Sequence, residues 1–399
     1  MATDPVTDWA TDFDHTDDRW AADPFPIWDD LRSACPVART ERYGGAWLPT
    51  THADVTAIAN DSEHFTSRSV IVSGHRPPVE LAPAGIAPPI SADPPFHAAS
   101  RRMLLPVFSP QRIAELEPST RAYCNELLDG VRGRDVVDAA VDYAQHIPVR
   151  VIARMLGLPD EDGDRFRGFV EGVIEAVADP REERIETFLG LLHYLSPYIE
   201  ARQADPQDDV ISLLLASDID GEPLDPLMVV RTIGLLLIAG IDTTWSAIGA
   251  SIWHLAATPA DRRRLVDEPA LIPTAIEELL RAYAPVTMAR LVKQDVTLAG
   301  CPMEAEDWVL LPFPAANRDP AFFDRADEVL LDRSPNRHAA FGLGMHRCAG
   351  SHLARMELRV ALEEWLRAFP DFSLADGDAV RWSGGQVRGP RTPPVRVAP

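Results

Sequence analysis

The sequence is short of positive charge for its length. Its 399 residues include 38 Lys and Arg against 61 Asp and Glu, so the formal net charge is −23. A chain this acidic is repelled by the phosphate backbone of nucleic acids and by anionic membrane surfaces. We therefore expect neither nucleic acid nor a membrane surface as a partner.

Cysteine is equally scarce. Cys35, Cys124, Cys301 and Cys348 lie far apart and form no C-x-x-C pair. This spacing argues against a disulfide framework and against a structural zinc site, and it fits a reducing compartment. The Asp-rich N-terminus also lacks the basic start and the apolar run of a signal peptide. We expect a cytoplasmic protein.

Long hydrophobic runs are missing too. The longest apolar stretch covers residues 232–241 and is bounded by Arg231 and Asp242, whereas a membrane span needs about 20 residues. With 46% hydrophobic residues the chain can still bury a large core. These numbers predict a soluble globular protein without a membrane anchor, and they leave one or two domains open.

Apolar residues three and four positions apart predict helices through most of the chain. Prolines gather at 76–95, where interspersed apolar residues favour a long ordered loop that packs on the rest of the protein. The pattern predicts a mainly α-helical protein with small β-sheets. The predicted helices include 118–131, 143–155, 166–177 and 273–283, and the predicted strands lie near 45–48, 70–72, 296–298, 308–311 and 395–397.

One predicted helix is long enough to cross the molecule. From residue 226 to residue 257 it would extend about 48 Å at the helical rise of about 1.5 Å per residue. Its run 235–238 is apolar on all sides, which is typical of a core helix. At 239–244 a glycine, Asp242 and two threonines interrupt the pattern. We expect the glycine and a buried hydroxyl to open the helix locally there.

The strongest chemical signal is the glycine-rich segment 341–350, which reads Phe-Gly-Leu-Gly-Met-His-Arg-Cys-Ala-Gly. It brings Cys348 to the start of a predicted helix, where unpaired backbone N–H groups and the helix dipole favour the metal-ligating thiolate. Its glycines permit a flat macrocycle to approach the backbone closely. A glycine-rich turn around a buried free cysteine is the alternative. A zinc cluster of His346, Cys348 and His352 lacks a fourth ligand.

This segment resembles the thiolate-ligand loop of the cytochrome P450 family, and further family signatures follow in order from about residue 20 to residue 399. The resemblance implies a single haem domain over residues 1–399, with a long helix over the haem and a Cys-ligand loop leading into a proximal helix. We expect poor order over about the first 20 residues. It further implies haem b, with Cys348 as the ligand of its iron. The defining positions that match are Phe341, Gly342, Gly344, His346, Cys348 and Gly350.

Other matches carry roles by the same resemblance. Glu278 and Arg281 lie three residues apart on one helical face, and with Arg333 they resemble the family's buried structural pair and its third member. Asp242 and Thr243 resemble the oxygen-binding segment, so Thr243 would hydrogen-bond dioxygen while Asp242 would supply protons from solvent. Haem propionates need cationic or donor partners. The positions that match the family's propionate-binding residues are His97, Arg101, Arg290 and His338.

The implied function is a monooxygenase that inserts one oxygen atom from O₂ into a small apolar or aromatic substrate by hydroxylation, O-dealkylation or epoxidation. No flavin, nicotinamide or iron–sulfur motif is visible, so electrons would come from NAD(P)H through a ferredoxin reductase and a ferredoxin. The ferredoxin would bind a basic proximal surface. The residues expected on that surface are Arg101, Arg102, Arg347, Arg355 and Arg359.

The substrate pocket is expected on the distal side of the haem, with mostly apolar walls. Two other functions stay open from the sequence: a peroxide-driven peroxygenase, and a haem carrier or gas sensor without turnover. The acid–alcohol pair Asp242 and Thr243 favours dioxygen over peroxide. The pocket positions implied by the resemblance include Leu236, Ala239, Gly240, Val286, Met288 and Val387.

Overall fold

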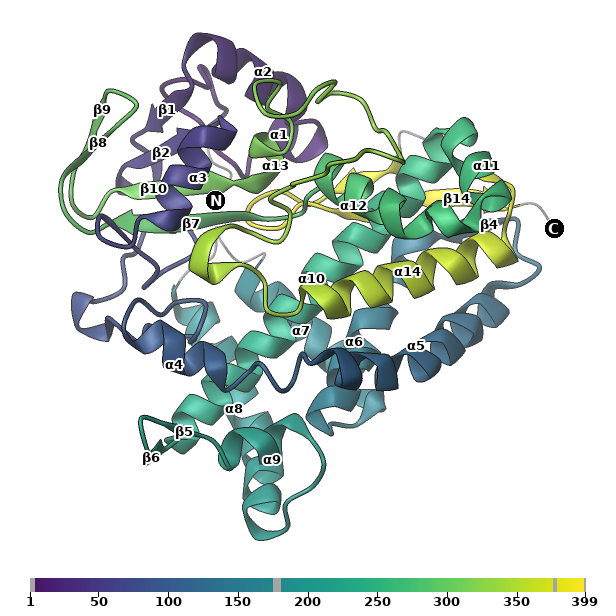
Figure 1. Ribbon diagram of the computed structural model, residues 1–399, viewed down its shortest axis with the longest axis horizontal. Coiled ribbons are helices and arrows are strands. Elements are labelled where there is room, and N and C mark those ends of the chain that lie inside the picture. The colour runs from purple at the N-terminus through teal and green to yellow at the C-terminus, as the bar shows by residue number, and fades with distance from the viewer. Residues whose placement is uncertain (1–3, 175–180, 376–378, 398–399) are drawn as a thin grey trace.

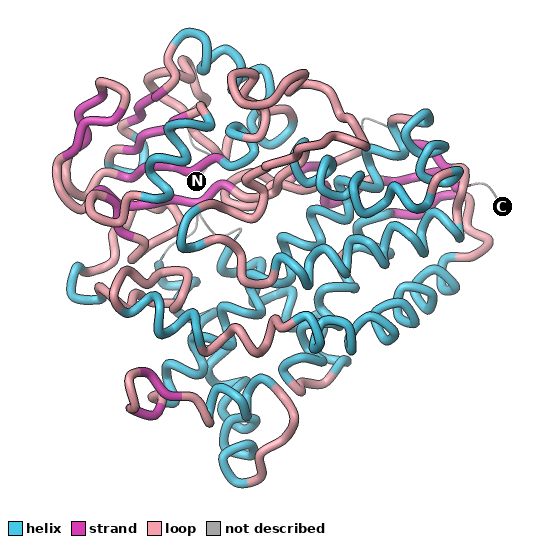
Figure 2. Tube along the Cα trace, viewed as in Figure 1, coloured by secondary structure: helices cyan, strands magenta, loops and turns pink. Residues whose placement is uncertain are grey.

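Helices form most of the molecule, and small sheets lie along its margins (Figures 1 and 2). The structure is a computed structural model that describes residues 4–174, 181–375 and 379–397. The largest sheet and the N-terminal helices occupy one end of the view, and the longer helices occupy the other. The mainly α-helical fold with small sheets that the sequence predicts is confirmed.

The long helix α10 (Pro226–Ala257) runs through the centre of the helical part, with the predicted bounds. It packs against α6 (His146–Leu156), α7 (Gly163–Ile174) and α14 (Ser351–Ala368). Within the described residues it is the single helix long and apolar enough to cross a membrane, but its neighbours enclose it as the central core helix. The expected local opening is absent, because residues 239–244 remain helical.

The other helices surround α10 or pack on the large sheet. The segment η3 (Ala139–Ala144) is a π-helical turn that leads into α6, where the sequence pattern predicts one continuous helix from Tyr143. The remaining helices are α1 (Asp18–Ala22), α2 (Phe25–Ala34), α3 (His52–Asn60), α4 (Phe96–Arg102), α5 (Pro110–Val131), α8 (Arg181–Ala204), α9 (Val210–Leu215), α11 (Pro259–Asp267), α12 (Ile272–Ala282) and α13 (Phe313–Ala316), with short 3₁₀ turns η1 (Arg42–Gly44), η2 (Val79–Leu81), η4 (Asp160–Asp162), η6 (Pro269–Leu271) and η7 (Gly344–His346).

The largest sheet has five strands in the order β1-β2-β10-β7-β3. Its neighbours are antiparallel except for β10 and β2, which run parallel with Trp308 opposite Ala46. The strands are β1 (Val37–Thr40), β2 (Ala46–Pro49), β3 (Phe65–Thr66), β7 (Thr287–Val292) and β10 (Trp308–Pro312).

Four smaller sheets complete the strand content. A three-stranded sheet of order β11-β14-β4 joins the C-terminal region to the segment before η3, and the pairs β12–β13, β5–β6 and β8–β9 are antiparallel. The strands are β4 (Val136–Asp138), β5 (Asp218–Ile219), β6 (Glu222–Pro223), β8 (Val296–Leu298), β9 (Cys301–Met303), β11 (Phe372–Leu374), β12 (Arg381–Trp382), β13 (Pro390–Thr392) and β14 (Pro394–Val397).

Several predicted boundaries need correction. The strand predicted at 70–72 is wrong, because only the Val70 carbonyl joins β7, by accepting a 3.0 Å bond from the Ala289 N–H. Helix α5 begins eight residues before the predicted Pro118, because Ser109 caps it and Pro110 takes its first turn. Helix α7 begins at Gly163 instead of Phe166. Its predicted end at Val177 lies outside the described residues.

Part of the N-terminal segment packs on the large sheet. Phe13 and Trp20 are buried in a cluster with Trp28 and the inner face of that sheet. The poor order expected over about the first 20 residues stays a prediction. The segment thus closes the sheet end of the molecule, away from the helical core in which α10 lies.

Candidate functional site

The loop before α14 holds Cys348 at the mouth of an internal cavity. The Cys348 N–H donates a 2.7 Å hydrogen bond to the Phe341 carbonyl, which closes the loop on itself. Gly344 has a φ of +65°, and a Cβ there would lie 2.4 Å from the Ala59 carbonyl oxygen. The loop therefore requires glycine at this position for both its backbone conformation and its packing.

Groups around the Cys348 sulfur favour its deprotonated form. Burial raises its pKa, while the Gly350 backbone N–H and the nearby guanidinium groups of Arg101, Arg347 and Arg355 act in the opposite direction. Cys348 is exposed and lines the cavity. A metal cation at the sulfur would supply the missing positive charge and keep the thiol deprotonated.

One continuous cavity brings together residues from α4, α10, β7 and the Cys348 loop. Apolar side chains make up most of its wall, and the hydroxyl-bearing Thr243 and Thr244 enter from α10. The Thr243 hydroxyl donates a 2.8 Å hydrogen bond to the Ala239 carbonyl one turn earlier. The sequence-predicted residues on the cavity wall are Arg101, Leu236, Ala239, Gly240, Thr243, Val286, Met288, Arg290, Phe341, Gly342, His346, Cys348 and Gly350.

Cationic and donor groups gather at one edge of this cavity. Arg290 is buried, and its guanidinium donates a 2.7 Å bond to the Ala289 carbonyl but forms no ion pair with any described residue. Burial lowers the pKa of Arg290 to about 10. The buried His97 Nε2 has no hydrogen-bond partner among the described residues, and its ring centroid lies 4.4 Å from that of His346. Burying cations without partners is costly. The edge therefore fits an anionic group such as the two propionates of a haem.

Two predicted contacts fall outside the cavity. His338 Nε2 lies 3.1 Å from the Glu277 carboxylate, so this ring is held by α12 and not turned toward the propionate edge. The expectation that His338 binds a propionate stays a prediction. Val387 lies behind the cavity wall, where it is buried and forms a β-bridge with Val286. Its place in the pocket stays a prediction.

Asp242 also points away from the cavity. Its carboxylate lies 2.8 Å from the guanidinium of Arg391, which β13 places on the outer side of α10. Arg391 also lies over the Trp245 ring at 4.4 Å and donates a 3.1 Å bond to the Ser246 hydroxyl. The acid beside Thr243 is thus buried in an ion pair with the C-terminal sheet region, a partner that the sequence analysis did not identify.

The predicted structural cluster around Glu278 is assembled. Its fully buried carboxylate accepts 2.8 Å hydrogen bonds from both Arg281 nitrogens that face it, and bonds of 2.9 and 3.0 Å from Arg333 Nε. The Asn336 side chain and the Leu330 N–H complete the shell. Although burial raises the pKa of Glu278, the hydrogen bonds from Arg281 and its neighbours hold the value below its ordinary range.

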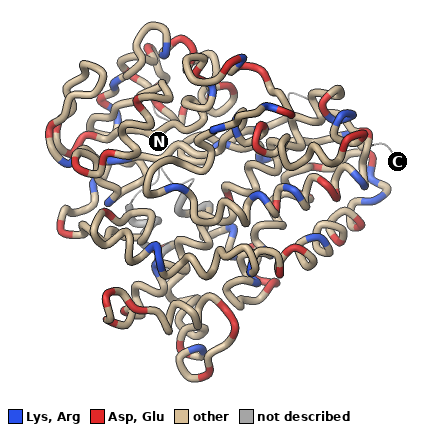
Figure 3. The backbone as a smooth tube through the Cα atoms, viewed as in Figure 1, with Lys and Arg blue, Asp and Glu red and all other residues tan. Residues whose placement is uncertain are grey.

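The expected basic surface is less uniform than its sequence suggests. Arg355 is bound to Glu277 at 2.6 Å, and Arg359 is bound to Glu117 at 2.5 Å and Glu363 at 3.4 Å. Arg102 and Arg347 are exposed and form no ion pair with a described residue. Figure 3 shows basic positions on α4 and on the loop before α14. Exposed positive charge without an ion-pair partner among the described residues is therefore present beside Cys348.

Sequence reasoning missed two polar groups of the site. The Ser67 hydroxyl lies 2.9 Å from His346 Nε2, which links the segment after β3 to the Cys348 loop. Glu357 of α14 lines the cavity and is 1% exposed. A signal for it was present, because Glu357 follows Leu353 and Ala354 by four and three residues and so shares their face of the helix.

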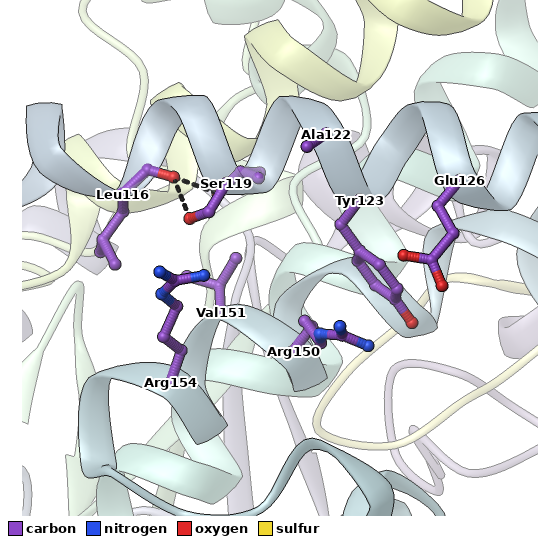
Figure 4. Close-up of a pocket in the computed structure, with 9 residues that line it drawn as sticks. Leu116, Ser119, Ala122, Tyr123, Glu126, Arg150, Val151 and Arg154 are labelled. Atoms are coloured by element: carbon purple, nitrogen blue, oxygen red, sulfur yellow. Dashed lines mark hydrogen bonds between the residues drawn. The ribbon is translucent and has the colours of Figure 1, made fainter.

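A second, smaller cavity lies between α5 and α6 (Figure 4). Arg150 and Arg154 point into it from α6, and Tyr123 and Glu126 face them from α5. Arg150 lies over the Tyr123 ring at 4.4 Å and is paired with Asp160 at 2.8 Å. Arg150 thus has an acidic partner in Asp160 of η4.

Comparisons with known proteins agree with this geometry. The family profile described as cytochrome P450 matches residues 182–381. The chain is 35% identical to a mycinamicin IV hydroxylase/epoxidase of Micromonospora griseorubida over 92% of this chain and 94% of that protein. It is 36% identical to the nocardicin C N-oxygenase of Nocardia uniformis subsp. tsuyamanensis over 94% and 96%.

A solved structure shows the same architecture. The crystal structure of CYP109E1 from Bacillus megaterium in complex with testosterone superposes with a TM-score of 0.86. The identity is 30%, and the match covers 94% of this chain and 98% of that chain. The sequence and the fold therefore agree with one family.

Proposed function

Because the chain belongs to the cytochrome P450 family and is a bacterial-type haem b monooxygenase, we propose that its substrate is a mostly apolar organic molecule and that its electrons come from NAD(P)H through a ferredoxin reductase and a ferredoxin. The observation that carries the proposal is the single cavity shared by Cys348 and Thr243. Its walls supply a thiolate, a hydroxyl and an apolar surface in one enclosed space.

The chain's own residues divide the work of holding the cofactor. The Cys348 sulfur would ligate the haem iron, and Arg101, Arg290 and His97 would hold the propionates at the cationic edge. When bound, the haem supplies the oxygen-activating chemistry, to which a thiolate ligand is suited. Burial, together with the nearby Arg290, lowers the pKa of His346 to about 2, so this ring is a neutral hydrogen-bonding group.

Thr243 provides the hydroxyl nearest the reacting end of the cavity. Its bond to the Ala239 carbonyl fixes the side chain in one orientation and leaves its oxygen able to accept another hydrogen bond. We expect Thr243→Ala to divert reducing equivalents into hydrogen peroxide, measured as peroxide released per NADPH oxidised. Unchanged coupling in this variant would contradict the role of the hydroxyl. Thr232→Ala, on the same helix but outside the cavity wall, is the control.

The substrate class follows from the lining of the distal wall. Ile90, Leu235, Leu236, Val286 and Met288 present hydrocarbon and thioether surface. Such a surface binds by removal of apolar area from water. Mycinamicin IV and testosterone, which the relatives' names contain, are the first compounds to test, by the change in spin state that displacement of iron-bound water produces.

The electron donor is proposed to bind beside Cys348. Arg102 and Arg347 offer unpaired positive charge on a chain whose net charge is −23, and such a patch orients an acidic partner. The cytoplasm is the proposed location, in keeping with cysteines that form no disulfide among the described residues.

Two measurements test the function. The reduced protein with carbon monoxide should show the strongly red-shifted absorption band of thiolate ligation, and Cys348→Ala should lose it. Turnover with NADPH, reductase and ferredoxin is then compared with turnover supported by peroxide. Product with peroxide alone would favour a peroxygenase, and a haem protein without product under either condition would favour a carrier or sensor.

A further inference from the structure

A tyrosine, a histidine and an aspartate form a hydrogen-bonded chain near the cavity. The Tyr283 hydroxyl lies 2.8 Å from His254 Nδ1, and His254 Nε2 lies 2.9 Å from an Asp261 carboxylate oxygen. Tyr283 ends α12, His254 belongs to the last turn of α10, and Asp261 belongs to the first turn of α11. None of the three is part of the cavity wall.

The two hydrogen bonds set the direction in which a proton can move along this chain. In the neutral imidazole whose Nε2–H donates to Asp261, Nδ1 accepts the bond from the Tyr283 hydroxyl. His254 is buried, whereas the Asp261 side chain is 24% exposed, so the chain ends at solvent. Burial raises the pKa of Tyr283 to about 12. The phenol is therefore protonated at pH 7 and has a base in contact with its proton.

Tyr283 also lies next to the cavity wall and to further aromatic rings. Leu280, three residues before it, and Pro285, two residues after it, belong to the wall. The Tyr283 ring packs edge-to-face on Trp253 with the centroids 5.6 Å apart, and Trp253 packs in the same way on the half-buried Trp382 at 5.1 Å. Phenol and indole rings are among the side chains most easily oxidised by one electron. These rings therefore offer a path for single electrons between the region of the cavity and solvent.

The surroundings of the rings decide where a missing electron is most stable. A phenol loses an electron easily only when its proton leaves with it, because the oxidised phenol is a strong acid. His254 is placed to take that proton, and Asp261 stabilises the imidazolium that results. Arg388 lies over the Trp382 ring at 4.1 Å and disfavours a second positive charge there. The missing electron is therefore most stable on Tyr283.

We propose that Tyr283, with His254 and Asp261, is a redox-active site that reduces the oxidised haem when no substrate is bound. This rests on the proposed function only in requiring that the haem is oxidised by O₂ or peroxide. One electron passes from the Tyr283 phenol to the oxidised haem, the phenol O–H bond breaks, and the proton moves to His254 Nδ1. A soluble thiol then returns the electron through Trp382 and Trp253, and His254 returns the proton. Two such returns convert two thiols into one disulfide and two protons.

The first experiment is electron paramagnetic resonance of the haem-loaded ferric protein, frozen rapidly after mixing with a peroxyacid in the absence of substrate. A tyrosyl radical is expected, identified by the narrowing of its signal when ring-deuterated tyrosine is incorporated. Tyr283→Phe should lower the yield several-fold. His254→Gln keeps a hydrogen-bond acceptor but no base, and it should also lower the yield several-fold. Absence of the radical in the wild type, or an undiminished yield in either variant, overturns the proposal.

Tyr143→Phe is the matched control. Tyr143 is buried and also lies next to a tryptophan, Trp365, with the ring centroids 5.1 Å apart. Its hydroxyl, however, donates a 2.9 Å hydrogen bond to the Ala361 carbonyl, which is not a base that takes the proton of an oxidised phenol. The radical yield in Tyr143→Phe should therefore equal that of the wild type. A loss of the signal in this variant instead would overturn the assignment to Tyr283.

The second experiment measures the rate at which hydrogen peroxide bleaches the haem absorption band of the substrate-free protein. Tyr283→Phe should bleach several-fold faster than the wild type, and Tyr143→Phe should bleach at the wild-type rate. Equal rates in Tyr283→Phe and the wild type overturn the protective role even where the radical is present. Neither experiment uses a ferredoxin or a substrate. A wild type that accepts no electrons from ferredoxin therefore contradicts the proposed function, while both results still decide the role of Tyr283.

Discussion

Two buried glutamates, Glu278 on α12 and Glu357 on α14, show how differently one side chain behaves in two parts of the same core. Both are at most 1% exposed. Glu278 is surrounded by donors from Arg281, Arg333 and neighbouring groups, and its pKa is lowered. Glu357 faces the cavity without such donors, and burial raises its pKa to about 8.

The difference lies in what the surrounding segments contribute. The chain around Glu278 brings two arginines, an amide and a backbone N–H to one carboxylate, so the charge is solvated by protein and the cluster ties distant segments together. The wall around Glu357 is apolar and leaves a proton-carrying group in contact with the cavity. A satisfied buried charge indicates a structural role, and an unsatisfied one beside a cavity indicates chemistry.

The largest effect on stability is expected when Glu278 loses one of its hydrogen-bond donors. Arg281→Ala leaves a buried carboxylate short of its main partner, and we expect a loss of about 3–5 kcal/mol in the free energy of unfolding. Urea denaturation followed by circular dichroism measures it. The control is Arg325→Ala, which breaks the half-exposed pair with Glu328 and should cost less than about 1 kcal/mol. Equal losses in the two variants would contradict the structural role of the Glu278 cluster.

The sequence predicted the parts of this site that depend on local pattern. The segment 341–350 identified Cys348 and its loop, and the long helix was placed with its true ends because its apolar pattern and capping positions are local. The Glu278 cluster, with Arg333 as its downstream arginine, was predicted from the resemblance to the family. The features that local patterns did not predict depend on contacts with residues far away in the sequence.

Three particular residues show why the rest was not predictable. Asp242 is paired with Arg391, almost 150 positions later, and no local pattern marks that contact. His338 stands at the matching position, yet Glu277 on α12 holds its ring. Glu357 lies among the charged residues of α14 and looks like a surface acid until the packing of α10 and α12 covers it.

A smaller effect is expected in the pH dependence of stability, which should differ between Glu357 and Glu278. Because folding raises the pKa of Glu357 from 4.5 to about 8, its folded state holds a proton that the unfolded state has lost between these values. The stability of the wild type relative to Glu357→Gln should therefore be greatest below pH 4.5, fall by up to about 1.4 kcal/mol per pH unit between pH 4.5 and 8, and level off above.

Paired urea denaturations of the two proteins at pH 5, 6, 7 and 8 measure that difference. The difference for Glu278→Gln should be flat over this range, because folding lowers the pKa of Glu278 and its contribution is lost only as the pH falls below the ordinary value of 4.5. A flat difference for Glu357→Gln would mean that this carboxyl titrates alike in the folded and unfolded protein.

The smallest effect is expected on the rate of ferredoxin association, which should distinguish paired from unpaired arginines near Cys348. Arg347 has no ion-pair partner among the described residues, whereas Arg359 is bound to Glu117 and Glu363. A free surface charge steers a partner, so Arg347→Ala should slow ferredoxin association by about 2- to 5-fold at low salt, and the difference should shrink near 0.5 M salt.

Arg359→Ala should leave the rate near that of the wild type, because its charge is already neutralised by two acids. Stopped-flow reduction with varied ferredoxin concentration measures both rates, and a larger effect from Arg359 than from Arg347 would show that internal pairing does not decide which arginines meet the partner.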